Sequence, residues 1–252
     1  MGMRRSLCLV ALAGIAISSS ALPSSTDWSY SGGDAGGMRY TTAAEITPGN
    51  VNRLVPVWTY RTGHMQAPED AFERSKFEVT PILVEDKLVL CTPFNVIIAL
   101  DPASGAELWR HDPKINMEQR PANGYACRGV AYWRDLQAPP DAKCAARIFT
   151  GTNDHRVIAV DLKDGQRCAD FGSGGEVVIE PEITLDWPGE YQITSSPVVV
   201  ADTVVVGSAI SDNMSVKAPR GTVHAFDARS GAPRWAFDPI PRDAAAAAAQ
   251  GW

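Results

Sequence analysis

The sequence predicts an all-β fold, and more specifically a partial β-propeller, in which four-stranded blades form an incomplete ring. Three observations support this prediction. Short apolar runs rich in β-branched residues alternate with turn residues, most clearly between Tyr191 and Phe237. This four-stranded antiparallel pattern recurs along the chain. The 21 glycines and 18 prolines among 252 residues favour many turns over long helices.

A repeated motif marks the end of the blades. Asp101–Trp109 and Asp227–Trp235 both read D-x-x-x-G-x-x-x-W, and Asp161 with Gly165 repeats the first half. The three Asp positions are 60 and 66 residues apart, a period that suits four strands and a long loop. We expect the Asp and Gly to form a tight turn and the Trp to pack between neighbouring sheets, as a structural rather than a catalytic group.

The predicted elements follow one another in the same order in each unit. A stretch rich in Gly and aromatic residues, Asp27–Tyr40, precedes a strand predicted over Leu54–Arg61. The middle unit has Cys168 or Phe171 where the Trp of the motif would fall. The other predicted strands are Val79–Val84, Lys87–Cys91 and Val96–Asp101, then Ala146–Thr150 and Arg156–Asp161, and then Pro197–Val200, Thr203–Val206 and Gly221–Asp227.

These units place the partial propeller at residues 27–243, with about the first three to four blades, and leave an Ala-rich tail at residues 244–252. Propellers close with roughly four to eight blades. An open arc leaves unpaired strand edges, which invite association with another chain. The sequence therefore predicts either a fragment of a longer protein or a chain that needs a partner, such as the missing C-terminal part of the propeller.

The first 21 residues are typical of a secretory signal peptide. Arg4 and Arg5 precede the apolar run Leu7–Ile17, and small residues lead to a cleavage site near Ala21. The run is shorter than the ~20 apolar residues that span a bilayer. We therefore expect export, and an uncleaved membrane anchor is the alternative.

The cysteines agree with export. Outside the predicted signal peptide the chain has Cys91, Cys127, Cys144 and Cys168, an even number without the C-x-x-C spacing of zinc sites. Cys144 and Cys168 flank one predicted strand pair and could form a disulfide. Buried free thiols are the alternative, because cysteine packs well as a small apolar residue.

The charge of the chain argues against a nucleic-acid partner. The formal net charge is −6 and the isoelectric point is about 5.2. A nucleic-acid-binding surface needs a basic patch to neutralise phosphates. We expect no nucleic-acid binding.

An ordered set of motifs resembles the quinoprotein dehydrogenases, which depend on pyrroloquinoline quinone (PQQ). The motifs are the repeated D-x-x-x-G-x-x-x-W, the Asp27–Tyr40 segment, E-V-T-P at Glu78–Pro81, C-R-G-V-A-Y-W at Cys127–Trp133 and T-S-S-P at Thr194–Pro197. The resemblance implies a quinoprotein-type propeller of about eight blades, with PQQ on its axis. C-R-G-V, L-C-T at Leu90–Thr92 and S-D-N at Ser211–Asn213 are most similar to the membrane-bound glucose, quinate and polyol dehydrogenase branch.

The resemblance also implies a cofactor site. PQQ carries three carboxylates, so its pocket needs cations and hydroxyls. By resemblance, Arg128 binds a cofactor carboxylate, Thr194 donates its hydroxyl to another, and Glu78 lines the pocket. Ser208 and Ala209 are expected near the cofactor edge.

A metal site is expected on the same grounds. Asp212 aligns with a calcium-ligating carboxylate of the family, and a carboxylate oxygen suits Ca²⁺ or Mg²⁺. One carboxylate does not make a metal site, however, and Asp-Asn pairs commonly build turns. An Asp that caps a loop is the alternative.

Two functions are therefore predicted. In the first, the chain is the N-terminal part of a periplasmic PQQ-dependent dehydrogenase that oxidises a sugar or polyol and passes electrons to membrane quinone. The family's catalytic Asp belongs to later blades, so no catalytic residue is assigned here and the chain alone is expected to be inactive. In the second, the chain is a non-enzymatic propeller that serves as a scaffold or assembly protein of the cell envelope.

Overall fold

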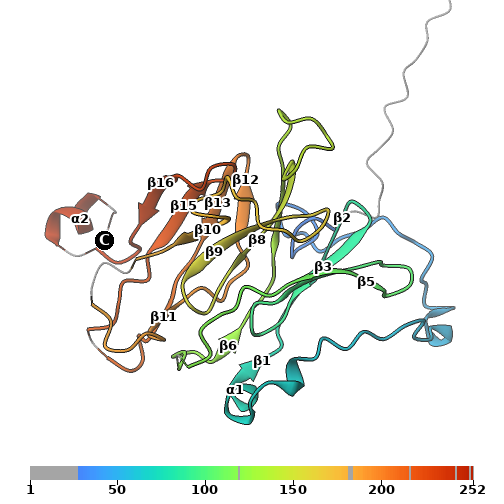
Figure 1. Cartoon of the computed structure of the whole chain (residues 1–252), viewed down its shortest axis with the longest axis horizontal. Coiled ribbons are helices and arrows are strands. Elements are labelled where there is room, and N and C mark those ends of the chain that lie inside the picture. The colour runs from blue at the N-terminus through green and yellow to red at the C-terminus, as the bar shows by residue number, and fades with distance from the viewer. Residues whose placement is uncertain are drawn as a thin grey trace, which may run out of the picture.

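Three four-stranded antiparallel sheets form the body of the chain (Figure 1). The computed structural model describes residues 28–118, 120–180, 184–215, 217–241, 243–249 and 251. Each sheet is one blade, and its first strand in sequence lies at one edge. Blade 1 contains β2 (Ile82–Val84), β3 (Lys87–Cys91), β4 (Ile97–Leu100) and β5 (Glu107–His111); blade 2 contains β7 (Ala131–Arg134), β8 (Ala146–Gly151), β9 (Arg156–Asp161) and β10 (Glu176–Val178); blade 3 contains β12 (Val198–Val200), β13 (Thr203–Val206), β15 (Val223–Asp227) and β16 (Pro233–Phe237). The predicted all-β fold of four-stranded blades is confirmed, and the described residues do not close a ring.

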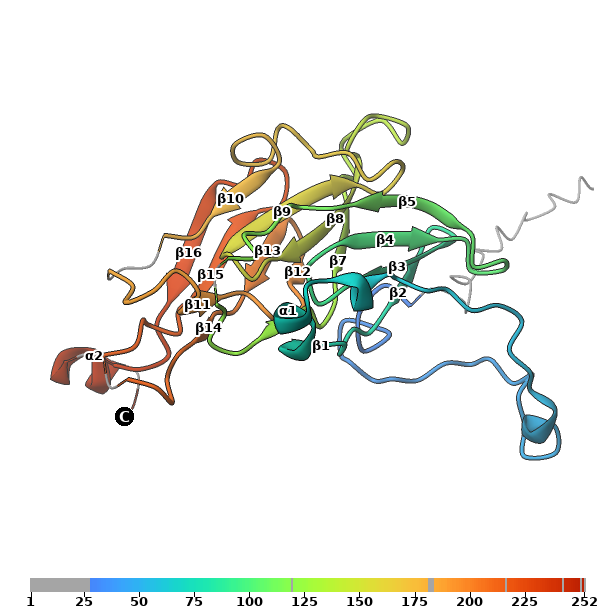
Figure 2. The ribbon, with the colours of Figure 1, turned by 60° about the horizontal axis from the view of Figure 1, so that its bottom comes forward.

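Short elements connect the blades. Parallel strands β1 (Ser75–Lys76) and β6 (Tyr125–Ala126) form one small sheet, and antiparallel strands β11 (Tyr191–Gln192) and β14 (Ala209–Ile210) form another. The Ala-rich stretch forms a helix, as expected for the residue with the strongest helix propensity, and this helix lies apart from the sheets (Figure 2). The helical elements are η1 (Val51–Arg53), η2 (His64–Gln66), α1 (Glu69–Glu73) and α2 (Ala244–Ala249).

The predicted signal peptide, residues 1–21, lies outside the described residues. Within the part of the chain that the structure describes, no helix has the length and apolar character needed to cross a membrane.

The strand predicted over Leu54–Arg61 is wrong. This segment is extended but forms no strand pairing among the described residues, and Val55 and Val57 are exposed. An extended segment counts as a strand only when a neighbour accepts its backbone hydrogen bonds. Here the segment lies beside blade 1, and the side chains of Trp58 and Tyr60 pack against an apolar cluster of that sheet.

The repeated motif forms the predicted turn. In blade 1, one carboxylate oxygen of Asp101 accepts hydrogen bonds from the backbone N–H and the hydroxyl of Ser104, both at 2.7 Å. Gly105 closes the turn with φ +71° and donates its N–H to the Asp101 carbonyl. In blade 3, Asp227 and Ser230 form the same bonds. Because glycine has no side chain, the turn leaves a bare backbone surface.

Tryptophan side chains pack on these bare turns. The indole of Trp58 lies against Gly105 and donates to the carbonyl of Pro102 at 3.1 Å. The indole of Trp109 lies against Gly165 and donates to the carbonyl of Leu162 at 2.9 Å. The predicted structural role of the motif Trp is therefore confirmed at Trp109, which joins blade 1 to blade 2.

The contact between blades 2 and 3 uses no tryptophan at the motif position. The backbone of Gly172 lies directly against Gly231, and its N–H donates to the carbonyl of Ser230 at 2.9 Å. Cys168 and Phe171, which stand where the Trp was expected, are fully buried in the core between blades 2 and 3. A direct backbone contact therefore replaces the indole in this blade pair.

An ion pair also joins blades 2 and 3, and it makes stability depend on pH. Arg229 donates two hydrogen bonds to the carboxylate of Asp135, at 2.6 and 2.8 Å, and this guanidinium lowers the pKa of Asp135 to about 2. The unfolded value is about 3.9. Because the folded pKa is the lower one, the stabilisation is fully present above about pH 4 and is lost as the pH falls toward about 2.

We expect the free energy of unfolding of the wild-type chain to fall between pH 5 and pH 2.5 more steeply than that of Asp135→Asn, which cannot titrate at this position. Urea unfolding at both pH values measures the two differences. Equal pH dependence in the two proteins would contradict the assignment of this pKa shift to the pair with Arg229.

Candidate functional site

The candidate site lies where the chain runs into the first strand of each blade. The three segments before β2, β7 and β12 carry Glu78, Arg128 and Thr194, each three or four residues before its strand begins. Strands β7 and β12 contact each other directly (Figure 2). Equivalent positions in three repeated units therefore meet at one end of the blades.

The small parallel sheet sets the register of two of these residues. Ser75 pairs with Tyr125 and Lys76 with Ala126. Continued by two residues, this register places Glu78 level with Arg128. The parallel pairing therefore explains why an acidic and a basic residue 50 positions apart face each other.

The three residues contact one another and form what we call the Arg128 cluster: Glu78, Arg128 and Thr194. The Arg128 guanidinium donates to the Thr194 hydroxyl at 2.7 Å and lies 3.1 Å from a Glu78 carboxylate oxygen. The backbone N–H of Arg128 donates to the Thr194 carbonyl, and its carbonyl accepts from the N–H of Thr80. The backbone at Arg128 thus bridges blade 1 and blade 3.

The cluster has the composition of an anion site. Thr194 is buried, whereas the side chains of Arg128 and Glu78 are 47% and 40% exposed. A guanidinium carries five N–H donors in a planar fork, and the described contacts use only some of them. The remaining donors suit a carboxylate. A hydroxyl that accepts from arginine can still donate its own proton, so Thr194 can serve the same ligand. These residues fit the carboxylates of PQQ.

Close packing beside Arg128 leaves no room for a side chain at Gly129. A Cβ atom there would lie 2.3 Å from the Ser196 hydroxyl oxygen, and Ser196 in turn hydrogen-bonds with Ser31. A cavity of about 220 Å³ lies next to this contact, lined by the 29–37 segment and by the first residues of β7 and β12. The glycine therefore allows three segments to meet next to the cluster.

Ala209 lies in β14, and Ser208 and Asp212 lie on either side of this strand. Ser208 bonds through its hydroxyl to the Tyr191 hydroxyl and to the carbonyl of Thr222. Ala209 pairs with Gln192 in the β11–β14 ladder. Continued along this ladder, the register puts Gly207 level with Thr194 and Asp212 five residues away, in an exposed turn. The Arg128 cluster thus does not include these three residues, and their roles stay predictions.

The described residues do not by themselves form a metal site at Asp212. Among them, one group of three potential metal ligands lies close together, namely Cys144, Cys168 and Asp170. Its two cysteines form a disulfide and so offer no thiolate. Asp212 alone provides too few oxygen ligands for Ca²⁺ or Mg²⁺, which need about six.

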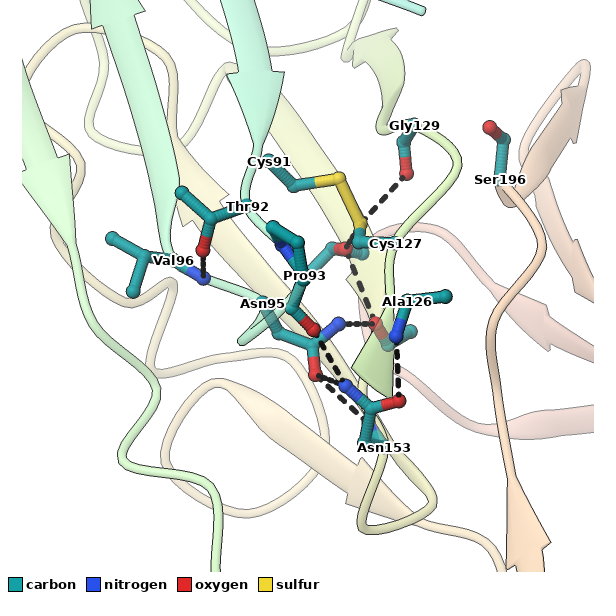
Figure 3. Close-up of a disulfide and its surroundings, with 12 residues drawn as sticks. Cys91, Thr92, Pro93, Asn95, Val96, Ala126, Cys127, Gly129, Asn153 and Ser196 are labelled. Atoms are coloured by element: carbon teal, nitrogen blue, oxygen red, sulfur yellow. Dashed lines mark hydrogen bonds between the residues drawn. A yellow bond between two sulfur atoms is a disulfide. The ribbon is translucent and has the colours of Figure 1, made fainter. Parts of the chain in front are cut away.

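Two disulfides are present among the described residues. Cys144–Cys168 is the one that the sequence left open against free thiols. Cys91–Cys127 (Figure 3) was not predicted, although Cys127 directly precedes Arg128 in the sequence. It joins the last residue of β3 to the segment before β7. The two cysteines are 36 residues apart with other strands between them, so spacing alone gave no signal.

Sequence reasoning also missed a chain of buried amide side chains, of which Asn95 and Asn153 are drawn in Figure 3. Asn153 donates to the side-chain oxygen of Asn95 at 2.7 Å and to the Pro93 carbonyl at 2.9 Å. Its own side-chain oxygen accepts from Gln192 at 3.0 Å. Asn95 and Gln192 are completely buried. The chain of amides links blade 1, blade 2 and β11, and a single Asn in a turn resembles any other turn residue in sequence.

Known proteins resemble this chain over nearly all of the described part. The family model for the PQQ-type glucose/ethanol/alcohol dehydrogenase β-propeller domain matches residues 28–252. The glycerol dehydrogenase large subunit of Gluconobacter oxydans (strain 621H) is 39% identical over 219 residues, which cover 87% of this chain and 29% of that protein. The quinoprotein glucose dehydrogenase of Escherichia coli (strain K12) is 35% identical over 221 residues, which cover 86% and 28%.

A solved structure agrees with these relatives. A quinohemoprotein alcohol dehydrogenase from Pseudomonas putida HK5 matches with a TM-score of 0.68 at 28% identity, over 87% of this chain and 27% of that one. The chain therefore spans less than a third of the length of the relatives it matches. The predicted family resemblance is confirmed, and the chain belongs to the PQQ-dependent quinoprotein dehydrogenase family, whose β-propeller domain it matches from residue 28 onward.

Proposed function

We propose that this chain is the N-terminal part of a periplasmic, PQQ-dependent dehydrogenase that oxidises a sugar or polyol and passes electrons to membrane quinone. The observation that carries the proposal is the convergence of Glu78, Arg128 and Thr194 within hydrogen-bonding distance. All three residues belong to sequence motifs that resemble those of the quinoprotein dehydrogenases. The relatives named glycerol dehydrogenase and glucose dehydrogenase support the substrate class.

In this proposal the Arg128 cluster binds cofactor carboxylates. Arg128 supplies the positive charge. The Thr194 hydroxyl accepts a hydrogen bond from the guanidinium and can donate its own proton to the ligand, and the Glu78 carboxylate orients the guanidinium through the ion pair. When bound, PQQ would supply the two-electron acceptor for alcohol oxidation. Ser208 and Ala209 would lie nearer the cofactor edge.

The proposed metal site needs more oxygen ligands than Asp212 provides. Asp212 would provide one carboxylate oxygen to Ca²⁺ or Mg²⁺. The remaining oxygen ligands would come from the cofactor and from other parts of the protein.

In this proposal the chain alone does not oxidise substrate. Oxidation of an alcohol requires a general base near the hydroxyl, and no residue of the chain is assigned that role. Strand β16 is exposed along its whole length, and its Trp235 is about half exposed. This surface suits contact with a further blade. We expect no glucose-dependent dye reduction by the chain with PQQ and Ca²⁺ or Mg²⁺.

A binding experiment tests the proposal. We expect Arg128→Gln to weaken PQQ binding by about 10- to 100-fold, because a hydrogen bond to a charged group contributes about 1.5–3 kcal/mol. Titration calorimetry in the presence of Ca²⁺ measures the dissociation constants. Arg53→Gln, at an exposed arginine in η1, is the matched control and should bind like the wild type.

Two outcomes would count against the proposal. If Arg128→Gln and Arg53→Gln bind PQQ equally well, the cofactor does not use the Arg128 cluster. If the wild-type chain shows no saturable binding at all, the non-enzymatic scaffold becomes the better explanation of the fold.

A further inference from the structure

We propose that the Cys91–Cys127 disulfide is a positioning group for the anion site: it holds the backbone at Arg128 so that the guanidinium stays level with Glu78 and Thr194. Cys127 directly precedes Arg128, and Cys91 is the last residue of β3. This inference rests on the proposed function, because it is there that Arg128 binds the anion.

The backbone of the segment that carries Arg128 makes few hydrogen bonds, although the neighbouring side chains of Tyr125, Ala126 and Cys127 are buried. Its strand, β6, is two residues long, and among the described residues it pairs only with the equally short β1. A two-stranded sheet of this size is not stable on its own in water. After Ala126 the backbone is held by two single hydrogen bonds, from the Arg128 N–H to Thr194 and from the Thr80 N–H to Arg128. Local pairing alone therefore does not fix the position of Arg128.

The other end of the disulfide is firmly held. β3 lies inside blade 1 and pairs with β2 on one side and β4 on the other. Cys91 itself pairs with Ile97, and both are completely buried. The disulfide therefore ties a segment with few backbone hydrogen bonds to the buried end of an inner strand of blade 1. A covalent tie of this kind limits how far the tied segment can move away.

Movement of this segment would disturb the whole Arg128 cluster. Arg128 meets Glu78 from blade 1 and Thr194 from blade 3. If the segment moved away from β3, the two backbone hydrogen bonds at Arg128 would open and the guanidinium would lose its register with both partners. Binding of a planar carboxylate by a guanidinium fork depends on this alignment.

The second disulfide provides a matched control within the same chain. Cys144–Cys168 lies at the other end of blade 2, since Arg134 pairs with Ala146 whereas Ala131, close to Arg128, pairs with Phe149. All four cysteines are buried to a similar degree. Removal of either disulfide is expected to destabilise the fold, but only removal of Cys91–Cys127 should disturb the Arg128 cluster.

The experiment compares Cys91→Ser/Cys127→Ser with Cys144→Ser/Cys168→Ser in the full chain. Hydrogen exchange by NMR follows the amides of Arg128 and Thr80, which donate the two backbone bonds. We expect their exchange to accelerate about tenfold or more in the first variant and to change less than about twofold in the second, relative to core amides of blade 2. Titration with PQQ and Ca²⁺ should show about tenfold weaker binding in the first variant only. If the serine variant does not fold, Cys91→Val/Cys127→Ala keeps the site apolar and is measured in its place.

The outcomes separate this inference from the proposed function. Equal exchange at Arg128 and Thr80 in the two disulfide variants would overturn the positioning role. Faster exchange with unchanged PQQ affinity would overturn it as well, because the cluster would then bind without the tie. If exchange responds as expected but even the wild-type chain binds no PQQ, the disulfide positions the cluster and the proposed function fails.

Discussion

Replacing Trp109 with alanine is expected to lower the free energy of unfolding by about 3–5 kcal/mol, as is usual when a buried tryptophan is truncated. Trp109 lies in β5 of blade 1 and is 8% exposed. Its ring covers the backbone of Gly165 in blade 2, and its indole N–H donates to the carbonyl of Leu162. The change opens a cavity between the two blades and removes that hydrogen bond. Equilibrium unfolding in urea, followed by circular dichroism, measures the loss.

The equivalent tryptophan of blade 3 gives the control. Trp235 stands at the same motif position but is 48% exposed, because none of the described residues provides a glycine turn on which it can pack. We expect Trp235→Ala to cost about 1 kcal/mol or less in this chain. Trp109→Phe should cost less than Trp109→Ala, because it keeps an aromatic ring and loses the hydrogen bond. Equal losses for Trp109→Ala and Trp235→Ala would show that the indole does not stabilise the contact between blades.

The turn motif shows how far the sequence predicts this fold. An Asp that accepts two bonds from the Ser three residues later, followed by a Gly with positive φ, is a local arrangement, and the four-residue spacing in Asp101–Gly105 is enough to predict it. The partner of each tryptophan is not local. Trp58 lies in a segment that was predicted as a strand, yet it packs on Gly105 while the segment itself remains unpaired. Strand identity depends on a neighbour that the segment's own residues do not specify.

The same distinction applies to the candidate site. Glu78, Arg128 and Thr194 were found as residue types in family motifs, and the repeat explains why they meet, since each precedes the first strand of its blade. The supporting contacts could not be found in this way. Cys91–Cys127 and the pair Asn95–Asn153 join different blades, and each member alone resembles an ordinary buried thiol or turn residue.

Replacing Arg147 with methionine is expected to destabilise the chain by about 3–5 kcal/mol, because buried acceptors that lose their donor cost about 1–3 kcal/mol each. The Arg147 side chain is 3% exposed. It donates to the carbonyl of Cys144 within blade 2, and to the carbonyls of Ala228 and Arg229 in blade 3, at 2.9, 3.4 and 2.6 Å. It also lies over the ring of Trp133, 5.5 Å from its centroid. Methionine fills much of the same volume but provides no donor, so all three carbonyls lose this partner.

The ion pair of Arg147 with Asp170 is the competing explanation, and its geometry argues for a small effect. The Asp170 side chain is 59% exposed, so water can replace its partner, and exposed pairs contribute about 0–1 kcal/mol. Asp170→Asn should therefore cost less than about 1 kcal/mol. Thermal and urea unfolding of the two variants compares the contribution of the guanidinium hydrogen bonds with that of the ion pair. If Asp170→Asn proves as destabilising as Arg147→Met, the carboxylate dominates. If only Arg147→Met is strongly destabilising, the hydrogen bonds of one buried guanidinium hold blade 3 to blade 2 where the motif tryptophan is missing.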